Sequence, residues 1–141
     1  MADEKSFVLG DDKELGEIVI APEVIEIIIG IAASKVEGVY SMQGSFANNV
    51  TELLGRSAYG KGVRLEMDDE GIKVEIYTYI KYGVSIPKVA TDIQRRVKEQ
   101  VLFMTDVVLT EVNVHVVGLI PEKTEEVNLE ELFGNDEDNH E

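Results

Sequence analysis

The chain has 141 residues and no cysteine, and its 28 acidic and 13 basic side chains give a net charge of −15. This length fits one domain with a single hydrophobic core, and the lack of cysteine excludes disulfides and thiolate chemistry. The negative charge opposes binding to the phosphates of a nucleic acid.

The charge is concentrated at the two ends of the chain. Residues 122–141 carry nine acidic side chains and one lysine, and residues 1–16 carry five acidic side chains and two lysines. We therefore expect an acidic N-terminal extension at 1–16, a domain at 17–121 and an acidic, disordered tail at 122–141. The N-terminus lacks the apolar segment of a signal peptide, and the longest strongly apolar run, Ile27–Ala33, is far too short to cross a bilayer. The sequence thus predicts a soluble, cytoplasmic protein.

The first part of the domain predicts a strand, a helix and a second strand. The strand is Glu17–Ile20, and a helix then extends from Pro22 to Glu37, because proline suits a first helical turn and Gly38 a helix end. The helix is so apolar that it must be buried on several sides or pack against another subunit. Its narrow polar stripe consists of Glu23, Glu26, Gly30, Ser34 and Glu37. The next strand is expected at Val39–Gln43.

Residues 44–62 are the least regular part, with a helical turn or two expected at Ala47–Leu54. The octet GRSAYGKG at 55–62 matches the first seven positions of the phosphate-binding loop G-x-x-x-x-G-K-[ST]. However, Gly62 has no hydroxyl for magnesium, and the octet precedes a strand where a phosphate loop precedes a helix. We interpret it as a connector. The alternative is a metabolite-binding loop whose phosphate ligands are Arg56, Tyr59 and Lys61.

A hairpin, a helix and a strand complete the domain. Apolar and polar residues alternate over Val63–Met67 and over Ile72–Tyr82, on either side of a turn at Asp68–Gly71. The second helix follows Ser85, a suitable N-cap. Its apolar residues share one stripe: Ile86, Val89, Ala90, Ile93, Val97, Val101 and Met104. The last strand is about Val107–Val117.

These elements predict a two-layer α+β domain. Two helices can cover only one face of a mixed sheet of about four strands, and the alternating strands leave the other face polar. Tyr77, Tyr79 and His115 fall on this open face, where aromatic side chains favour a protein interface over RNA stacking. For His115 we expect a hydrogen bond to Asn113 or to a cross-strand tyrosine.

No pattern in the sequence predicts a catalytic, metal or cofactor site. The two histidines, His115 and His140, are far apart, and no serine lies in a nucleophile elbow. The second helix has four basic residues, Lys88, Arg95, Arg96 and Lys98, which we call its basic subset. This subset could bind anionic lipid or RNA, although a solvated face with an Asp92–Arg96 pair is the simpler interpretation.

In the tail, Val127–Phe133 could form a short docking motif.

Four short motifs in this sequence are A-P-E-V at 21–24, V-E-G-V at 36–39, Y-G-V-S-I-P at 82–87 and E-V-N-V-H-V-V-G at 111–118. They are similar to the motifs of the alkaline-shock-protein family, the envelope stress response proteins of Gram-positive bacteria, and the chain resembles this family. The resemblance covers residues 16–121 and includes the octet at 55–62.

The resemblance implies a small, non-enzymatic α/β protein linked to cell-envelope stress, without a cofactor or catalytic residues. It implies protein partners and possible tethering by a membrane partner. The residues themselves predict a homo-oligomer, no nucleic acid and no membrane insertion. Short, acidic-tailed members accompany acetyl-CoA carboxylase genes, which points to control of fatty-acid synthesis. From the residues and the resemblance together we expect a self-associating interaction module.

Overall fold

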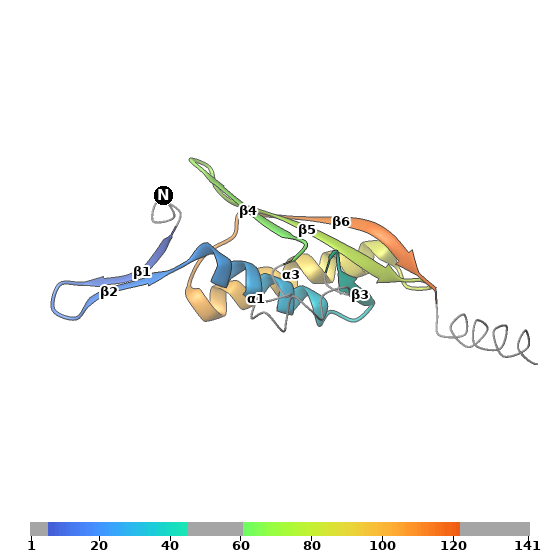
Figure 1. Ribbon diagram of the computed structural model, residues 1–141, viewed down its shortest axis with the longest axis horizontal. Helices are drawn as coiled ribbons and strands as arrows, with labels where there is room; N and C mark the ends of the chain where they lie inside the picture. The colour runs from blue at the N-terminus through green and yellow to red at the C-terminus, as the bar shows by residue number, and fades with distance from the viewer. Residues whose placement is uncertain (1–5, 45–60, 122–141) are drawn as a thin grey trace, which may run out of the picture.

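The structure is a computed structural model that describes residues 6–44 and 61–121 (Figure 1). The turn expected at Ala47–Leu54, the motif at Val127–Phe133 and His140 lie outside these ranges. In chain order, the elements are β1 (Phe7–Asp12), β2 (Gly16–Ile20), α1 (Pro22–Ser34), β3 (Val39–Met42), β4 (Val63–Asp68), β5 (Gly71–Lys81), α3 (Ile86–Thr105) and β6 (Glu111–Ile120).

Strand β5 is the centre of the main sheet. Strand β6 pairs with it in parallel, whereas β3 and β4 pair with it antiparallel, at 78–80 and 71–76 respectively. Tyr77 marks the junction between β3 and β4, because its N–H donates to the Gly62 carbonyl (2.8 Å) and its carbonyl accepts from the Gln43 N–H (2.9 Å). Strands β3 and β4 therefore follow one another along one edge of β5, and β6 occupies the other edge.

Gly62 is required at this junction by its backbone. Its φ is +78°, and a Cβ atom there would lie 2.8 Å from the Tyr77 carbonyl oxygen and 3.1 Å from the Gln43 nitrogen. Only glycine adopts this conformation readily and leaves room for both hydrogen bonds. The last residue of the 55–62 octet is thus accounted for by sheet geometry.

Both helices cover one face of the main sheet (Figure 1), which confirms the predicted two-layer α+β fold. Helix α1 packs against α3 and against β3 and β4, and α3 packs against β6. Alternate residues of β5 point into the resulting core, and all four are buried: Val74, Ile76, Thr78 and Ile80.

The helices differ from the prediction at their ends. Helix α1 stops at Ser34, short of Glu37, and Gly30 is buried where a polar stripe was expected. In α3, Ser85 caps the helix as predicted by accepting from the Lys88 N–H (3.3 Å). The buried stripe ends on Thr105, whose hydroxyl donates to the Val101 carbonyl (2.7 Å), and Met104 is exposed.

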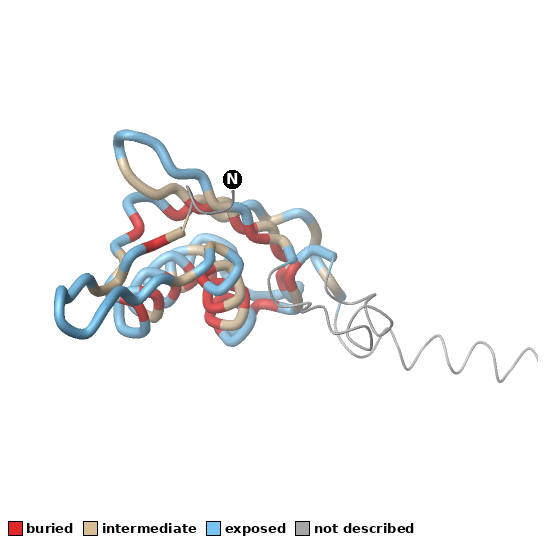
Figure 2. Tube along the Cα trace, turned by 60° about the vertical axis from the view of Figure 1, so that its left-hand side comes forward, coloured by how far each residue is buried: buried red, intermediate tan, exposed pale blue. Residues whose placement is uncertain are grey.

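Strands β1 and β2 form a separate antiparallel sheet, with Phe7 opposite Ile20 and Val8 opposite Val19. The strand predicted at 17–20 is present, but it pairs with β1 and not with the main sheet, and residues 7–12, for which no element was predicted, form β1. We call residues 7–20 the N-terminal arm. Phe7 anchors the arm in the core, and the rest of it is mostly exposed (Figure 2). The last strand also starts later than expected, at Glu111, after the left-handed Asp106 (φ 65°) ends α3.

Candidate interaction site on strand β6

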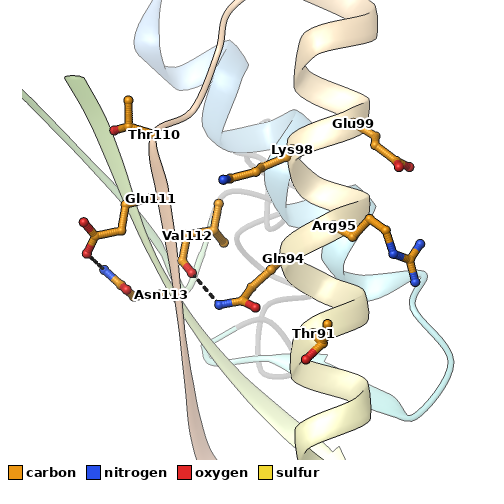
Figure 3. Close-up of a pocket in the computed structure, with 9 residues that line it drawn as sticks. All are labelled: Thr91, Gln94, Arg95, Lys98, Glu99, Thr110, Glu111, Val112 and Asn113. Carbon is orange, nitrogen blue, oxygen red and sulfur yellow. Dashed lines mark hydrogen bonds between the residues drawn. The ribbon is translucent and has the colours of Figure 1, made fainter.

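Strand β6 is an edge strand with ten residues. One of its edges pairs with β5, and no strand pairs with its other edge among residues 6–44 and 61–121. Gln94 of α3 reaches this free edge, where its amide Nε2 donates to the Val112 carbonyl (2.9 Å, Figure 3). Alternate residues of a strand direct their backbone groups to the same edge. Val114 and Val116 therefore also present their N–H and carbonyl groups there.

A cleft of about 670 Å³ runs between this free edge and α3. Lys98 points from α3 toward β6, whereas Arg95 and Glu99 point away from the strand (Figure 3). The cleft thus combines a cationic side chain with backbone groups of an edge strand. Its lining residues are Thr91, Gln94, Arg95, Lys98, Glu99, Thr110, Glu111, Val112 and Asn113.

On the open face of the sheet, β5 and β6 share a polar cluster centred on Glu75. The two carboxylate oxygens have different partners: Oε1 lies 2.6 Å from His115 Nε2, and Oε2 accepts from Asn113 Nδ2 (2.8 Å). The same Asn113 amide also donates to Glu111 (2.9 Å). Hydrogen bonds from His115 and then Asn113, with a smaller effect of the Arg64 charge, lower the pKa of Glu75.

Aromatic contacts extend the Glu75 cluster along the sheet. The Tyr77 and His115 rings stack with centroids 4.4 Å apart and an angle of 11° between planes. Tyr79 lies over Gly118, where a Cβ atom would come within 2.8 Å of its ring. The prediction that these three side chains share the open face is confirmed, but the hydrogen-bond partner expected for His115 is wrong. The partner is Glu75, which the parallel register brings beside it.

The basic subset of α3 is only partly paired. Asp92 contacts Lys88 (3.1 Å) and Arg95 (2.6 Å). These contacts lower the pKa of Asp92, and the largest cause is the hydrogen bond from Lys88. The expected Asp92–Arg96 pair is wrong, since Arg95 takes the carboxylate at the i+3 position. Within the described part of the chain, Arg96 and Lys98 form no ion pair.

The structure does not test the alternative phosphate-binding loop. Arg56 and Tyr59 lie outside the described residues, and Lys61 is exposed, with its side chain facing Gly44. Across residues 6–44 and 61–121, no three histidine or carboxylate side chains gather as a metal cage. The loop remains a prediction.

Sequence reasoning did not single out Gln94 or Glu75. Glu75 was visible only as one polar position in an alternating strand. Its role follows from the parallel pairing that sets Tyr77 opposite His115 and Glu75 opposite Asn113. Gln94 is one exposed residue of an amphipathic helix, and no sequence pattern indicates that its amide meets a strand edge.

This arrangement, a mixed sheet with two helices on one face and an ordered polar cluster on the other, defines a small α+β domain. The chain belongs to the alkaline shock protein 23 family, described as having a cell envelope-related function, whose family model matches residues 10–121. The resemblance to alkaline shock proteins is thereby confirmed.

Three relatives illustrate the family. The uncharacterized protein YqhY of Bacillus subtilis is 45% identical over 122 residues, 86% of this chain and 90% of that protein. The uncharacterized protein Spy1535 of Streptococcus pyogenes is 41% identical, over 86% and 93% of the two chains. A stress response regulator gls24 homolog of the same species is 31% identical, over 74% of this chain and 59% of that protein.

No solved structure matches the chain significantly. Within the described residues, neither helix combines the length and the apolar character needed to cross a bilayer.

Proposed function

We propose that this protein is a non-enzymatic regulatory or scaffolding protein of the cytoplasm that binds other proteins through β6. The free edge of β6 beside the cleft is the observation that carries the proposal. An extended segment of a partner can add to such an edge by backbone hydrogen bonds, with side-chain pockets providing specificity. The edge is long enough for this, because β6 has ten residues and, within the described ranges, only the Val112 carbonyl is occupied by a side chain.

The charges around the cleft favour an acidic partner segment. Lys98 points toward the edge and has no ion pair among the described residues, so a partner carboxylate there would gain a charge-assisted hydrogen bond. On the open face, the Glu75 cluster already satisfies its own hydrogen bonds and holds Tyr77 in place. Rigid aromatic groups of this kind suit a protein interface.

The wider role in our proposal is control of envelope stress and of fatty-acid synthesis through acetyl-CoA carboxylase. The envelope part is supported by the description of the alkaline shock protein 23 family and by the name of the gls24 relatives. The acetyl-CoA carboxylase part follows from the resemblance to short, acidic-tailed members.

The test is in-cell crosslinking of the full-length protein in a Gram-positive host, followed by affinity capture and mass spectrometry. Val114→Pro blocks the free edge, because its lost N–H faces away from β5 and proline is tolerated on such an edge. We expect this variant, and Lys98→Glu, to lose most of the partner captured by the wild type. Lys73→Glu, on the open face, is the charge-matched control, and thermal unfolding checks that each variant folds.

Equal capture by the wild type and both variants would overturn the role of β6. Acetyl-CoA carboxylase subunits should be among the proteins lost with Val114→Pro. If they are missing from the wild-type capture, the link to fatty-acid synthesis is wrong, whether or not Val114→Pro shows that β6 binds a partner. Deleting residues 122–141 separates a contribution of the acidic tail.

A further inference from the structure

The free edge of β6 leads directly into the acidic tail of the same chain. Strand β6 ends at Ile120, beside the edge that no strand of the described residues covers. Pro121 follows, and proline favours the second position of a turn because its ring fixes φ. After a turn of about four residues, a common hairpin length, residues 125–133 are enough to run back along β6 as far as Val112. The tail can therefore reach the free edge and the cleft of its own domain.

The tail segment Val127–Phe133 has the side-chain pattern that this edge requires. An antiparallel pairing can set Phe133 opposite Val112. Leu129 then lies opposite Val116, and residues opposite each other share one face of a sheet. Val112 is buried and Val116 packs against the core, so both tail side chains would cover apolar surface on the helix side of β6.

The charge that faces the edge is positive. Lys98 points toward β6 and has no ion pair within the described residues. Two other charged lining residues, Arg95 and Glu99, point away from the strand (Figure 3), and Arg95 already has an ion pair. Glu111 accepts a hydrogen bond from Asn113 on the open face. The cleft thus offers one free cation beside the backbone of β6, among the residues that the structure describes.

The tail supplies the matching charge. It carries nine acidic residues and one lysine. Glu130 and Glu131 precede Phe133 closely, and Asp136 follows it, so a pairing along β6 brings a carboxylate within reach of Lys98. An acidic segment with alternating apolar residues is therefore joined covalently to an apolar edge with a free cation.

We propose that the tail adds to the free edge of β6 as an antiparallel strand through residues 127–133 and covers the cleft beside α3. This inference rests on the proposed partner-binding role of β6 and adds its regulation, because the tail holds the edge that a partner segment needs. The covalent link gives the tail a high effective concentration at the edge. A partner must therefore displace the tail, which sets the threshold for partner binding.

The first test is amide hydrogen exchange of the full-length protein, followed by NMR. Val114 and Val116 present their N–H groups to the free edge, so a docked tail should slow their exchange about tenfold or more. Phe133→Asp should abolish this protection. Asn139→Asp is the matched control, because it adds the same charge to the tail outside the docking segment, and it should leave the protection unchanged.

Two outcomes of the exchange experiment would overturn the docking. One is fast exchange of both amides in the wild type. The other is protection that survives Phe133→Asp and falls on dilution, which would assign the edge to a second copy of the chain.

The second test uses the absence of tryptophan from the sequence. Phe133→Trp places a single reporter in the docking segment, and Phe103→Trp provides an exposed reference, because Phe103 is 83% exposed. We expect emission from Phe133→Trp to be shifted to the blue of this reference. Adding Lys98→Glu should remove much of the shift, whereas Lys73→Glu on the open face should not. Equal emission from the two tryptophan variants would contradict the docking.

Crosslinking capture separates this inference from the partner-binding role. A tenfold protection leaves about one molecule in ten with a free edge, so Phe133→Asp should strengthen partner binding by up to about tenfold. A docked tail together with partner capture that is insensitive to Val114→Pro would overturn only the partner-binding role. An exposed tail together with capture that Val114→Pro abolishes would overturn only the docking.

Discussion

Strand β5 presents one face to α1 and α3 and the other face to solvent, and its residues contribute differently on the two sides. Val74, Ile76, Thr78 and Ile80 are buried on the helix side. On the open side, Glu75 and Tyr77 make specific contacts with β6 at partial exposure. Burial on the first side stabilises the fold, and hydrogen bonds and stacking on the second side order a surface. Substitutions on the two sides should therefore differ in size and in their dependence on pH.

The largest effect should come from the buried face. Ile76 has 0% exposure, so Ile76→Ala leaves a cavity among α1, α3 and the sheet and should lower the free energy of unfolding by about 3 kcal/mol. Urea denaturation followed by circular dichroism at micromolar protein measures this. Ile18→Ala in the exposed arm makes the same chemical change and should cost less than about 0.5 kcal/mol. Similar losses for both variants would mean that the arm belongs to the core.

The next effect should come from the junction of β3 and β4. Gly62→Ala adds a Cβ atom 2.8 Å from the Tyr77 carbonyl at a positive φ, so both strain and lost hydrogen bonds destabilise the fold. We expect a loss of about 2 kcal/mol or more, measured by the same denaturation. Gly16→Ala is the control, because Gly16 also has a positive φ (+107°) but no atom within 4 Å of the added Cβ. It should show the strain alone, and an equal loss would rule out the steric contribution.

The sequence was informative wherever a repeating pattern matched a single element. Alternation predicted β5 and its open face, and the apolar spacing of Val89, Ile93, Val97 and Val101 predicted α3. Prediction from the sequence failed where the structure depends on contacts between segments that are distant in the chain. Strand β1 was missed because FVLGDD is short and acidic at its end, and its pairing with β2 is interrupted near Gly10.

The candidate site depends still more on such distant contacts. His115 and Tyr77 were predicted on the open face, but the partner of His115 required the parallel register of β5 and β6. The free edge of β6 depends on which strands pair, and alternation within one strand does not encode that. Met104 was predicted in the core because it continues the helical spacing. Thr105 replaces it, since its hydroxyl bonds to Val101 as the helix ends.

A smaller effect, visible only against pH, should come from the open face. The hydrogen bonds of His115 and Asn113 lower the pKa of Glu75 in the folded protein. The ionised carboxylate therefore stabilises the fold above its unfolded pKa of about 4.3, and this contribution disappears as pH falls through the folded pKa. Glu75→Gln should lower stability at pH 7 by less than about 1 kcal/mol, because the group is solvent-screened, and should match the wild type in strong acid. Urea titrations across pH measure the difference, with Glu66→Gln on β4 as control. A pH-independent difference would contradict the assignment.

The smallest effect should have the opposite sign and come from α1. Desolvation, and then the charge of Glu23, raise the pKa of Glu26. A raised carboxyl pKa means that the folded state favours the protonated form, so the stability linked to that proton is present in acid and is lost as pH rises through the folded pKa. Glu26→Gln keeps the shape and removes the charge. It should therefore raise the stability at pH 7 by a few tenths of a kcal/mol relative to its effect in acid, since partial exposure screens the charge.

Glu23→Gln sharpens this last prediction, because it removes only the neighbouring charge that is second among the causes. It should lower the pKa of Glu26 without restoring its ordinary value, since desolvation remains. A carboxyl NMR titration of Glu26 in the wild type and in Glu23→Gln reads this directly. If Glu23→Gln restored the ordinary pKa completely, repulsion and not burial would govern Glu26. The raised pKa of Glu26 would then come from a neighbouring charge and the lowered pKa of Glu75 from hydrogen bonds, and burial would not contribute to their opposite shifts.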